Sequence, residues 1–115
     1  MSSAEAMELR IPADAVYLSV VRMFGGSVAK TFALDPERTE DLRLALSEIC
    51  AATVEAWSDV GAEMSIDVTW DDAAVRFTCP GVAMAEDAPR WVLVRSLIPD
   101  VRSDGDGAIT FSIER

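Results

Sequence analysis

The sequence contains no histidine, and its two cysteines, Cys50 and Cys79, are far apart and form no CxxC pair. Zinc sites use histidine and closely spaced cysteines, so the composition argues against one, and we expect no metal site. The lack of an imidazole also argues against a serine hydrolase, because nothing is present to activate a hydroxyl. Cys50 falls on an apolar helix face, where we expect a small core residue.

Long apolar runs are also missing. No stretch approaches the ~20 continuous apolar residues of a membrane-spanning helix. The first ten residues have neither the basic start nor the apolar run of a signal peptide. We therefore expect a cytoplasmic protein that does not contact a membrane.

Basic side chains are scarce, with 10 Lys and Arg against 20 Asp and Glu, for a net charge of −10. Phosphate contacts need Lys and Arg, so this balance argues against a nucleic-acid partner. It suits a basic protein partner, or serves solubility alone. Half of the 115 residues are hydrophobic, which predicts one folded domain over residues 1–115 with a single core.

The longest strongly periodic stretch is residues 35–57. Asp35 suits the N-cap of a helix and Pro36 suits the first helical position. The residues recurring at three- and four-residue spacing are Leu42, Ala45, Leu46, Ile49, Cys50, Thr53 and Trp57. This spacing predicts a helix with one face packed on a flat surface. Glu48 lies near the edge of that stripe, one turn before Ala52.

The rest of the chain predicts strands and two more helices. Alternating apolar residues predict strands at 7–11, 64–70, 75–79 and 109–113, and a short strand could begin at Val101. Helical spacing predicts helices over about 13–31 and 88–98. The expected buried face of the first is Val16, Val20, Phe24 and Val28, with Tyr17 and Val21 beside it. Gly25-Gly26 either breaks this helix or marks a close approach of another backbone; we favour the continuous helix.

These elements follow the order β-α-α-β-β-α-β(β). The two hairpins imply antiparallel pairing, and three amphipathic helices can cover one side of the sheet. The predicted fold is therefore α/β: a two-layer sandwich whose sheet is mixed but mostly antiparallel, with three helices on one face.

The segment LRLALSEICAATVEA, residues 42–56, resembles the N-box helix of the GHKL (histidine-kinase-like) ATPase fold, in its anti-sigma-factor and serine-protein-kinase branch. The Ser47-Glu48 pair carries the resemblance. In that family the Glu is the general base, and an Asn four residues later holds Mg²⁺ on ATP. Here the Asn position is Ala52, which offers no ligand atom.

The family's DxGxG box corresponds to the stretch from Cys79 to Ala83. Cys79 replaces the Asp that reads adenine, and a thiol cannot replace a carboxylate that accepts a hydrogen bond. Ala83 replaces the second Gly, and only Gly81 remains. Residues 85–91, in the region of the family's ATP lid, contain no glycine, so their amides offer no phosphate cradle.

This pattern predicts a dismantled nucleotide site with no bound cofactor. In it, Glu48 is a vestigial base and Gly81 a vestigial glycine. Alternatively, Glu48 is a carboxylate at the helix boundary that is solvated or paired with Arg90 or Arg95.

The resemblance implies an anti-sigma-factor-like regulator that forms a homodimer. Such a protein binds a sigma factor, a STAS-type anti-anti-sigma factor or both, and here ATP binding and kinase activity are expected to be lost. The predicted partner-binding residues are Arg22, Lys30, Arg38 and Glu40, together with the remnant of the lid. Two alternatives stay open: an active ATP-dependent serine-protein kinase, and a scaffold subunit of an unrelated assembly.

Overall fold

The computed structural model describes residues 6–57, 61–81, 85–104 and 107–115. Its elements are β1 (Ala6–Pro12), a 3-10 turn η1 (Ala15–Tyr17), α1 (Leu18–Thr31), α2 (Pro36–Trp57), β2 (Glu63–Trp70), β3 (Ala74–Pro80), α3 (Pro89–Leu97), β4 (Arg102–Ser103) and β5 (Ala108–Glu114). Each predicted strand and helix is present, and the predicted order is confirmed. The predicted end of the central helix, near Asp59, lies outside the described residues.

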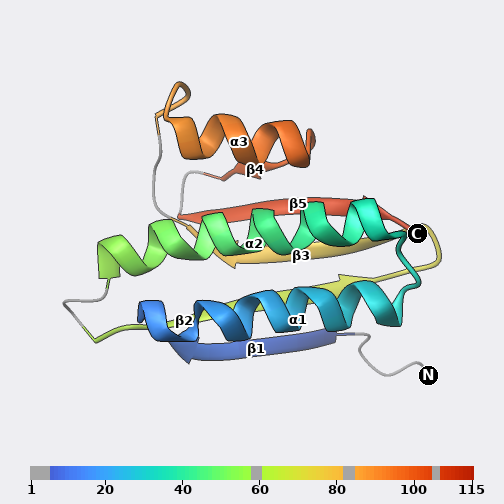
Figure 1. The fold of residues 1–115 in the computed structure, drawn as a ribbon, viewed down its shortest axis with the longest axis horizontal. Coiled ribbons are helices and arrows are strands. Elements are labelled where there is room, and N and C mark those ends of the chain that lie inside the picture. The colour runs from blue at the N-terminus through green and yellow to red at the C-terminus, as the bar shows by residue number, and fades with distance from the viewer. Residues whose placement is uncertain (1–5, 58–60, 82–84, 105–106) are drawn as a thin grey trace.

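The five strands form one sheet in the order β1-β2-β3-β5-β4. Figure 1 shows α1 over β1 and β2, α2 over β3 and β5, and α3 beside α2 near β4. The two-layer α/β arrangement is therefore confirmed.

The expectation of a mixed sheet is wrong for the described strands, because each neighbouring pair is antiparallel. The connection between β1 and β2 explains this in part. Two helices, rather than one, join these strands, so the chain re-enters the sheet at the end that it left and runs the opposite way (Figure 1).

The core lies between the sheet and the helices. Alternate residues of the strands are buried there: Met64, Ile66 and Val68 of β2, Val75, Phe77 and Cys79 of β3, and Ile109, Phe111 and Ile113 of β5. Phe77 and Phe111 are opposite each other in the β3–β5 register, and their rings stack with centroids 4.8 Å apart. This layer packs against Leu42, Leu46 and Ile49 of α2, which are fully buried. The stripe predicted for the central helix is thus its core face.

The start of α2 follows the predicted capping. The Asp35 carboxylate accepts a hydrogen bond from the Arg38 backbone N–H at 2.8 Å. This bond, together with the Arg38 side chain, holds the pKa of Asp35 below its usual value. The N-cap therefore fixes where the helix begins.

The first helix begins later than predicted. Residues 15–17 form the 3-10 turn η1, and Val16, expected on the buried face, is 68% exposed. One local and one long-range contact hold this turn. The Asp14 carboxylate accepts from the Val16 N–H at 3.0 Å, and the Ala13 N–H donates to the Ala62 carbonyl at 2.9 Å. An acidic side chain that bonds nearby backbone in this way competes with helix formation.

The Gly25-Gly26 pair lies inside the continuous helix α1, as we favoured. A Cβ on Gly25 would lie 3.1 Å from Cδ1 of Leu46 and 3.6 Å from Cα of Arg43. Gly25 therefore marks a close approach of α1 to α2. Among the described residues, none of the helices combines the length and apolar character that crossing a bilayer requires.

Candidate functional site

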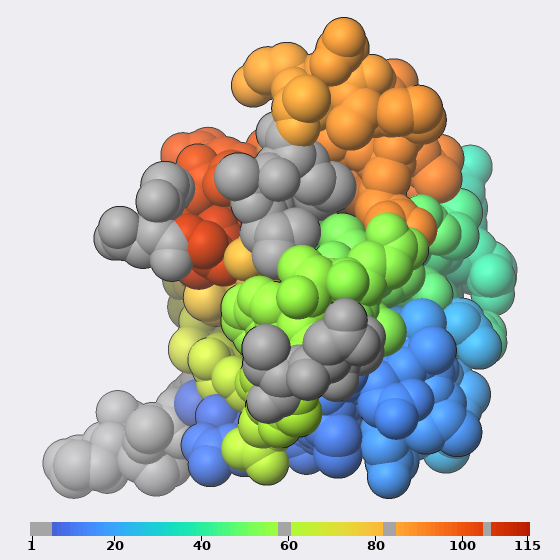
Figure 2. Space-filling model, turned by 90° about the vertical axis from the view of Figure 1, so that its left-hand side faces the viewer, coloured from blue at the N-terminus to red at the C-terminus, as the bar shows by residue number. Residues whose placement is uncertain are grey.

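The residues that the sequence singled out come from three elements. Glu48 and Ala52 lie on α2, Cys79 and Gly81 lie on or next to the end of β3, and Arg90 is in the first turn of α3. Since α2 contacts both β3 and α3, the fold gathers these elements at one end of the molecule. Figure 2 shows this end, with α2 (green) between α1 (blue) and α3 (orange).

Glu48 is held by an arginine. Arg90 Nε lies 3.0 Å from Glu48 Oε1, and its two terminal nitrogens lie 3.1 and 3.0 Å from the carboxylate oxygens of Glu55. We call these three residues the Arg90 cluster. Hydrogen bonds and charge from Arg90 lower the pKa of Glu55, and the two carboxylates raise the pKa of Arg90. Arg95, the other partner considered, instead pairs with Glu86 at 2.9 Å.

The position of the family's Mg²⁺ ligand is buried. Ala52 is 6% exposed and presents only a methyl group. The neighbouring Thr53 is fully buried, and its hydroxyl lies 3.3 Å from the Ile49 carbonyl and 3.2 Å from the Pro80 carbonyl. The one proton of this hydroxyl is shared between the two carbonyls, and the contact with Pro80 joins α2 to the end of β3.

Cys79 is a core residue. It is 1% exposed and lies opposite Ile109 in the β3–β5 ladder. Burial raises the pKa of its thiol well above the usual value, and burial raises the pKa of Cys50 to about 12. Both thiols are therefore protonated at neutral pH. The prediction that Cys50 is a core residue is confirmed, since it is fully buried.

Gly81 packs against β5. A Cβ at this position would lie 2.6 Å from Cγ1 and 2.9 Å from Cδ1 of Ile109. The Gly81 N–H donates to the Gly107 carbonyl at 2.5 Å. The glycine is thus required by packing, and its amide is already used. No sequence pattern signals the contact with Ile109, which depends on the register of two strands.

These residues do not fit a Mg·ATP complex. Ala52 has no metal ligand, the Glu48 carboxylate is bound to Arg90, and the Gly81 amide is bound within the protein. Among the side chains that the structure describes, no group of three or more His, Cys, Asp or Glu is placed to hold a metal ion. Val82 and Ala83, which complete the glycine box, lie outside the described residues.

The residues predicted to bind a partner lie on α1 and the first part of α2, and three of them have contacts within the chain. Arg22 donates to Ser47 Oγ at 3.2 Å. Arg38 contacts the Asp35 carboxylate at 3.0 Å and donates to the Glu114 carbonyl. Glu40 pairs with Arg43 at 3.2 Å. Lys30 is exposed near the end of α1.

Comparison with models of known protein families identifies the family of this chain. Residues 11–108 match the histidine kinase-like ATPase domain, and because this covers most of the chain, the protein belongs to that family. The family-level resemblance seen in the sequence is thereby confirmed.

The chain is also similar to the serine-protein kinase RsbW of Bacillus mycoides (strain KBAB4). It is 31% identical over 67 residues, which cover 57% of this chain. The matched stretch spans 42% of that protein's length.

Proposed function

We propose that the chain is a protein-binding regulator of the anti-sigma-factor type that no longer uses ATP. The similarity to RsbW supports the branch of the family. In this role, the chain retains the ATPase fold and uses its surface to bind other proteins.

The Arg90 cluster is the observation that carries this proposal. In the family, the Glu at this position must be free to accept a proton. Here Glu48 is bound to a guanidinium at 3.0 Å and its side chain is 27% exposed. A carboxylate oxygen that already accepts a hydrogen bond from a guanidinium is occupied, which supports a structural role for Glu48 rather than that of a base.

The proposed partners are a sigma factor, a STAS-type anti-anti-sigma factor, or both, with the chain acting as a homodimer. Charge supports a basic partner, since this chain carries −10 and opposite fields speed association. The proposed contacts are Arg22, Lys30, Arg38 and Glu40.

Co-purification from the native host tests this proposal. The tagged chain should recover a sigma factor or a STAS protein, identified by mass spectrometry. Reversing the charge of Glu40, a proposed contact, with Glu40→Lys should reduce the recovery of a basic partner, whereas Glu63→Lys makes the same change in net charge on β2 and should not. If neither class of protein is recovered under conditions that preserve weak complexes, the proposed function is wrong.

An ATP-dependent serine-protein kinase is the second candidate, favoured by the retained Glu48 and by the name of the relative. A ligand at 100 times its dissociation constant stabilises its protein by about 2.7 kcal/mol. For a chain of this length, that is a rise in melting temperature of several degrees. Our proposal expects no such rise with Mg·ATP.

A further inference from the structure

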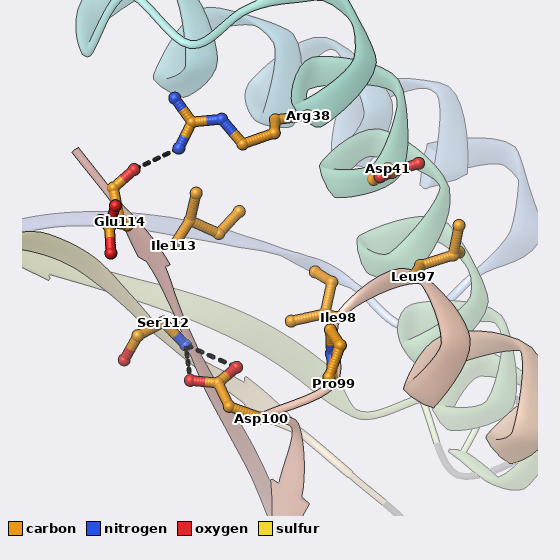
Figure 3. A pocket seen from close by; sticks show the side chains of 9 residues that line it. All are labelled: Arg38, Asp41, Leu97, Ile98, Pro99, Asp100, Ser112, Ile113 and Glu114. Atoms are coloured by element: carbon orange, nitrogen blue, oxygen red, sulfur yellow. Dashed lines mark hydrogen bonds between the residues drawn. The ribbon is translucent and has the colours of Figure 1, made fainter.

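A hollow lies on the surface away from the Arg90 cluster. It has a volume of about 540 Å³ and is lined by Arg38, Asp41, Leu97, Ile98, Pro99, Asp100, Ser112, Ile113 and Glu114. Figure 3 shows its position between the first turns of α2, the end of α3 with the residues that follow it, and the end of β5. We call it the α2–α3–β5 groove.

The floor of this groove is apolar. Ile98 and Ile113 are 5% and 8% exposed, so each shows a small part of its side chain, and Leu97 is half-buried beside them. Pro99 is exposed and adds a rigid apolar edge. Such a floor can take up one bulky apolar side chain from a partner, and the contact releases water from both surfaces.

The rim of the groove is acidic. Three of the residues that line the groove are acidic: Asp41, Asp100 and Glu114. The single lining cation, Arg38, is already engaged by Asp35 and by the Glu114 carbonyl (Figure 3). Asp100 accepts from the Ser112 N–H at 3.2 and 3.4 Å, a bond that positions this carboxylate without neutralising it.

Two exposed leucines lie on α2 and α3, in sequence between the residues of the groove and those of the Arg90 cluster. α2 and α3 run antiparallel, because the cluster joins them at one end and Leu97 and Asp41 line the groove at the other. Leu44 lies between Asp41 and Glu48 along α2, and Leu93 lies between Arg90 and Leu97 along α3. The two leucines are 41% and 37% exposed. Leu44 follows Asp41 by about one turn and Leu93 precedes Leu97 by about one turn, so each lies on about the same side of its helix as a groove-lining residue.

We propose that this groove docks a basic, amphipathic segment of a partner protein, with a bulky apolar side chain on the floor and Lys or Arg side chains against the rim. A second copy of this chain is a weaker match for this acidic rim, because the chain has only 10 Lys and Arg against 20 Asp and Glu. The groove is separate from the Arg90 cluster, so this inference does not depend on whether ATP is bound.

Three labelled helical peptides of equal length test the proposal on the full chain: one of Leu and Lys, one of Leu and Glu, and one of Lys and Gln. Fluorescence anisotropy should show binding of the Leu/Lys peptide alone. The binding should weaken between 0.15 M and 0.5 M salt, because added ions screen the rim.

Charge-matched variants locate the site. Asp41→Asn with Asp100→Asn removes two rim charges while keeping side-chain shape, and should weaken the Leu/Lys peptide by about 10-fold. Asp87→Asn with Glu63→Gln makes the same change in net charge elsewhere on the molecule and should leave affinity unchanged. Circular dichroism confirms that both variants are folded.

Several outcomes would overturn the inference. One is equal weakening by the two double variants, which would mean a general charge effect. Others are equal binding of the Leu/Glu or the Lys/Gln peptide, or no binding of the Leu/Lys peptide at millimolar concentration. Self-association of the wild type that the Asp41→Asn and Asp100→Asn pair abolishes would assign the groove to a second copy instead.

Discussion

Arg90 Nε lies 3.0 Å from Oε1 of Glu48, although 42 residues separate the two in the chain. The same guanidinium reaches both oxygens of Glu55 through its two terminal nitrogens. Such two-point contacts are among the stronger side-chain hydrogen bonds. Arg90 of α3 therefore contacts two carboxylates of α2, and one of them is Glu48, which the family resemblance marks as a base.

The first prediction concerns this anchor. Arg90→Gln should lower the free energy of unfolding by about 1 kcal/mol, because a partly buried carboxylate loses its donor. Urea denaturation measures the change. Arg95→Gln is the control: its partner Glu86 is 87% exposed, so its loss should change little. Equal midpoints for wild type and Arg90→Gln would show that the contact does not hold the helices together.

The second prediction concerns Gly81. Gly81→Ala should destabilise the fold by about 1–3 kcal/mol in the absence of any nucleotide, because its Cβ would overlap the Ile109 side chain. In an Ile109→Ala background, the same substitution should cost clearly less. If the cost is the same in both backgrounds, the glycine is needed for a reason other than this contact.

The sequence was sufficient for the periodic parts of the fold. The apolar stripe and the Asp35 cap of α2 depend on residues close in the chain, and the alternation in the strands depends on burial of one sheet face. The start of α1 was predicted incorrectly because Ala13 bonds to Ala62, a contact between segments far apart in the sequence.

The site was less predictable for the same reason. Glu48 and two arginine partners could be named, but choosing Arg90 over Arg95 requires the placement of α3 on α2. The contact of Gly81 with Ile109 depends on the β3–β5 register, in which Pro80 lies opposite Ala108. The groove has no sequence signature, because its lining comes from three elements.

The third prediction compares the two glycines of α1. Gly26→Ala should raise the free energy of unfolding by about 0.5–1 kcal/mol, since alanine favours helix and the new Cβ would lie 3.8 Å from the nearest atom, on Arg43. Gly25→Ala should gain less, because its Cβ would lie 3.1 Å from Leu46. Thermal unfolding of both variants measures the difference, and an equal gain would contradict the close packing of α1 on α2.

The fourth prediction is a loss of stability in acid. Backbone N–H groups lower the pKa of Asp35 and of Asp71, the latter through Ala73 and Ala74. A carboxylate whose folded pKa is lowered stabilises the fold above its unfolded pKa of about 3.9, and this contribution is lost as the pH falls through the folded pKa. Urea midpoints from pH 5 down to pH 2.5 should fall.

Variants test whether these two carboxylates cause the fall in urea midpoint with decreasing pH. Asp35→Asn with Asp71→Asn should flatten the fall in urea midpoint over this pH range, because neither amide titrates. Asp87→Asn, an exposed acid in the turn before α3, should keep the wild-type slope. A double variant as steep as the wild type would place the acid sensitivity in other groups.

The last prediction tests whether restoring one ligand restores the nucleotide site. Ala52→Asn supplies the family's Mg²⁺ ligand, yet it should give no rise in melting temperature with Mg·ATP, because Glu48 and the Gly81 amide stay engaged within the protein. The substitution should also destabilise the fold by about 1–3 kcal/mol, since it places an amide at a buried position. A family member with intact motifs serves as the positive control. A rise of several degrees with Mg·ATP, absent with Mg²⁺ alone, would mean that the pocket lacks only this ligand, and the proposed loss of ATP binding would then reduce to a single substitution.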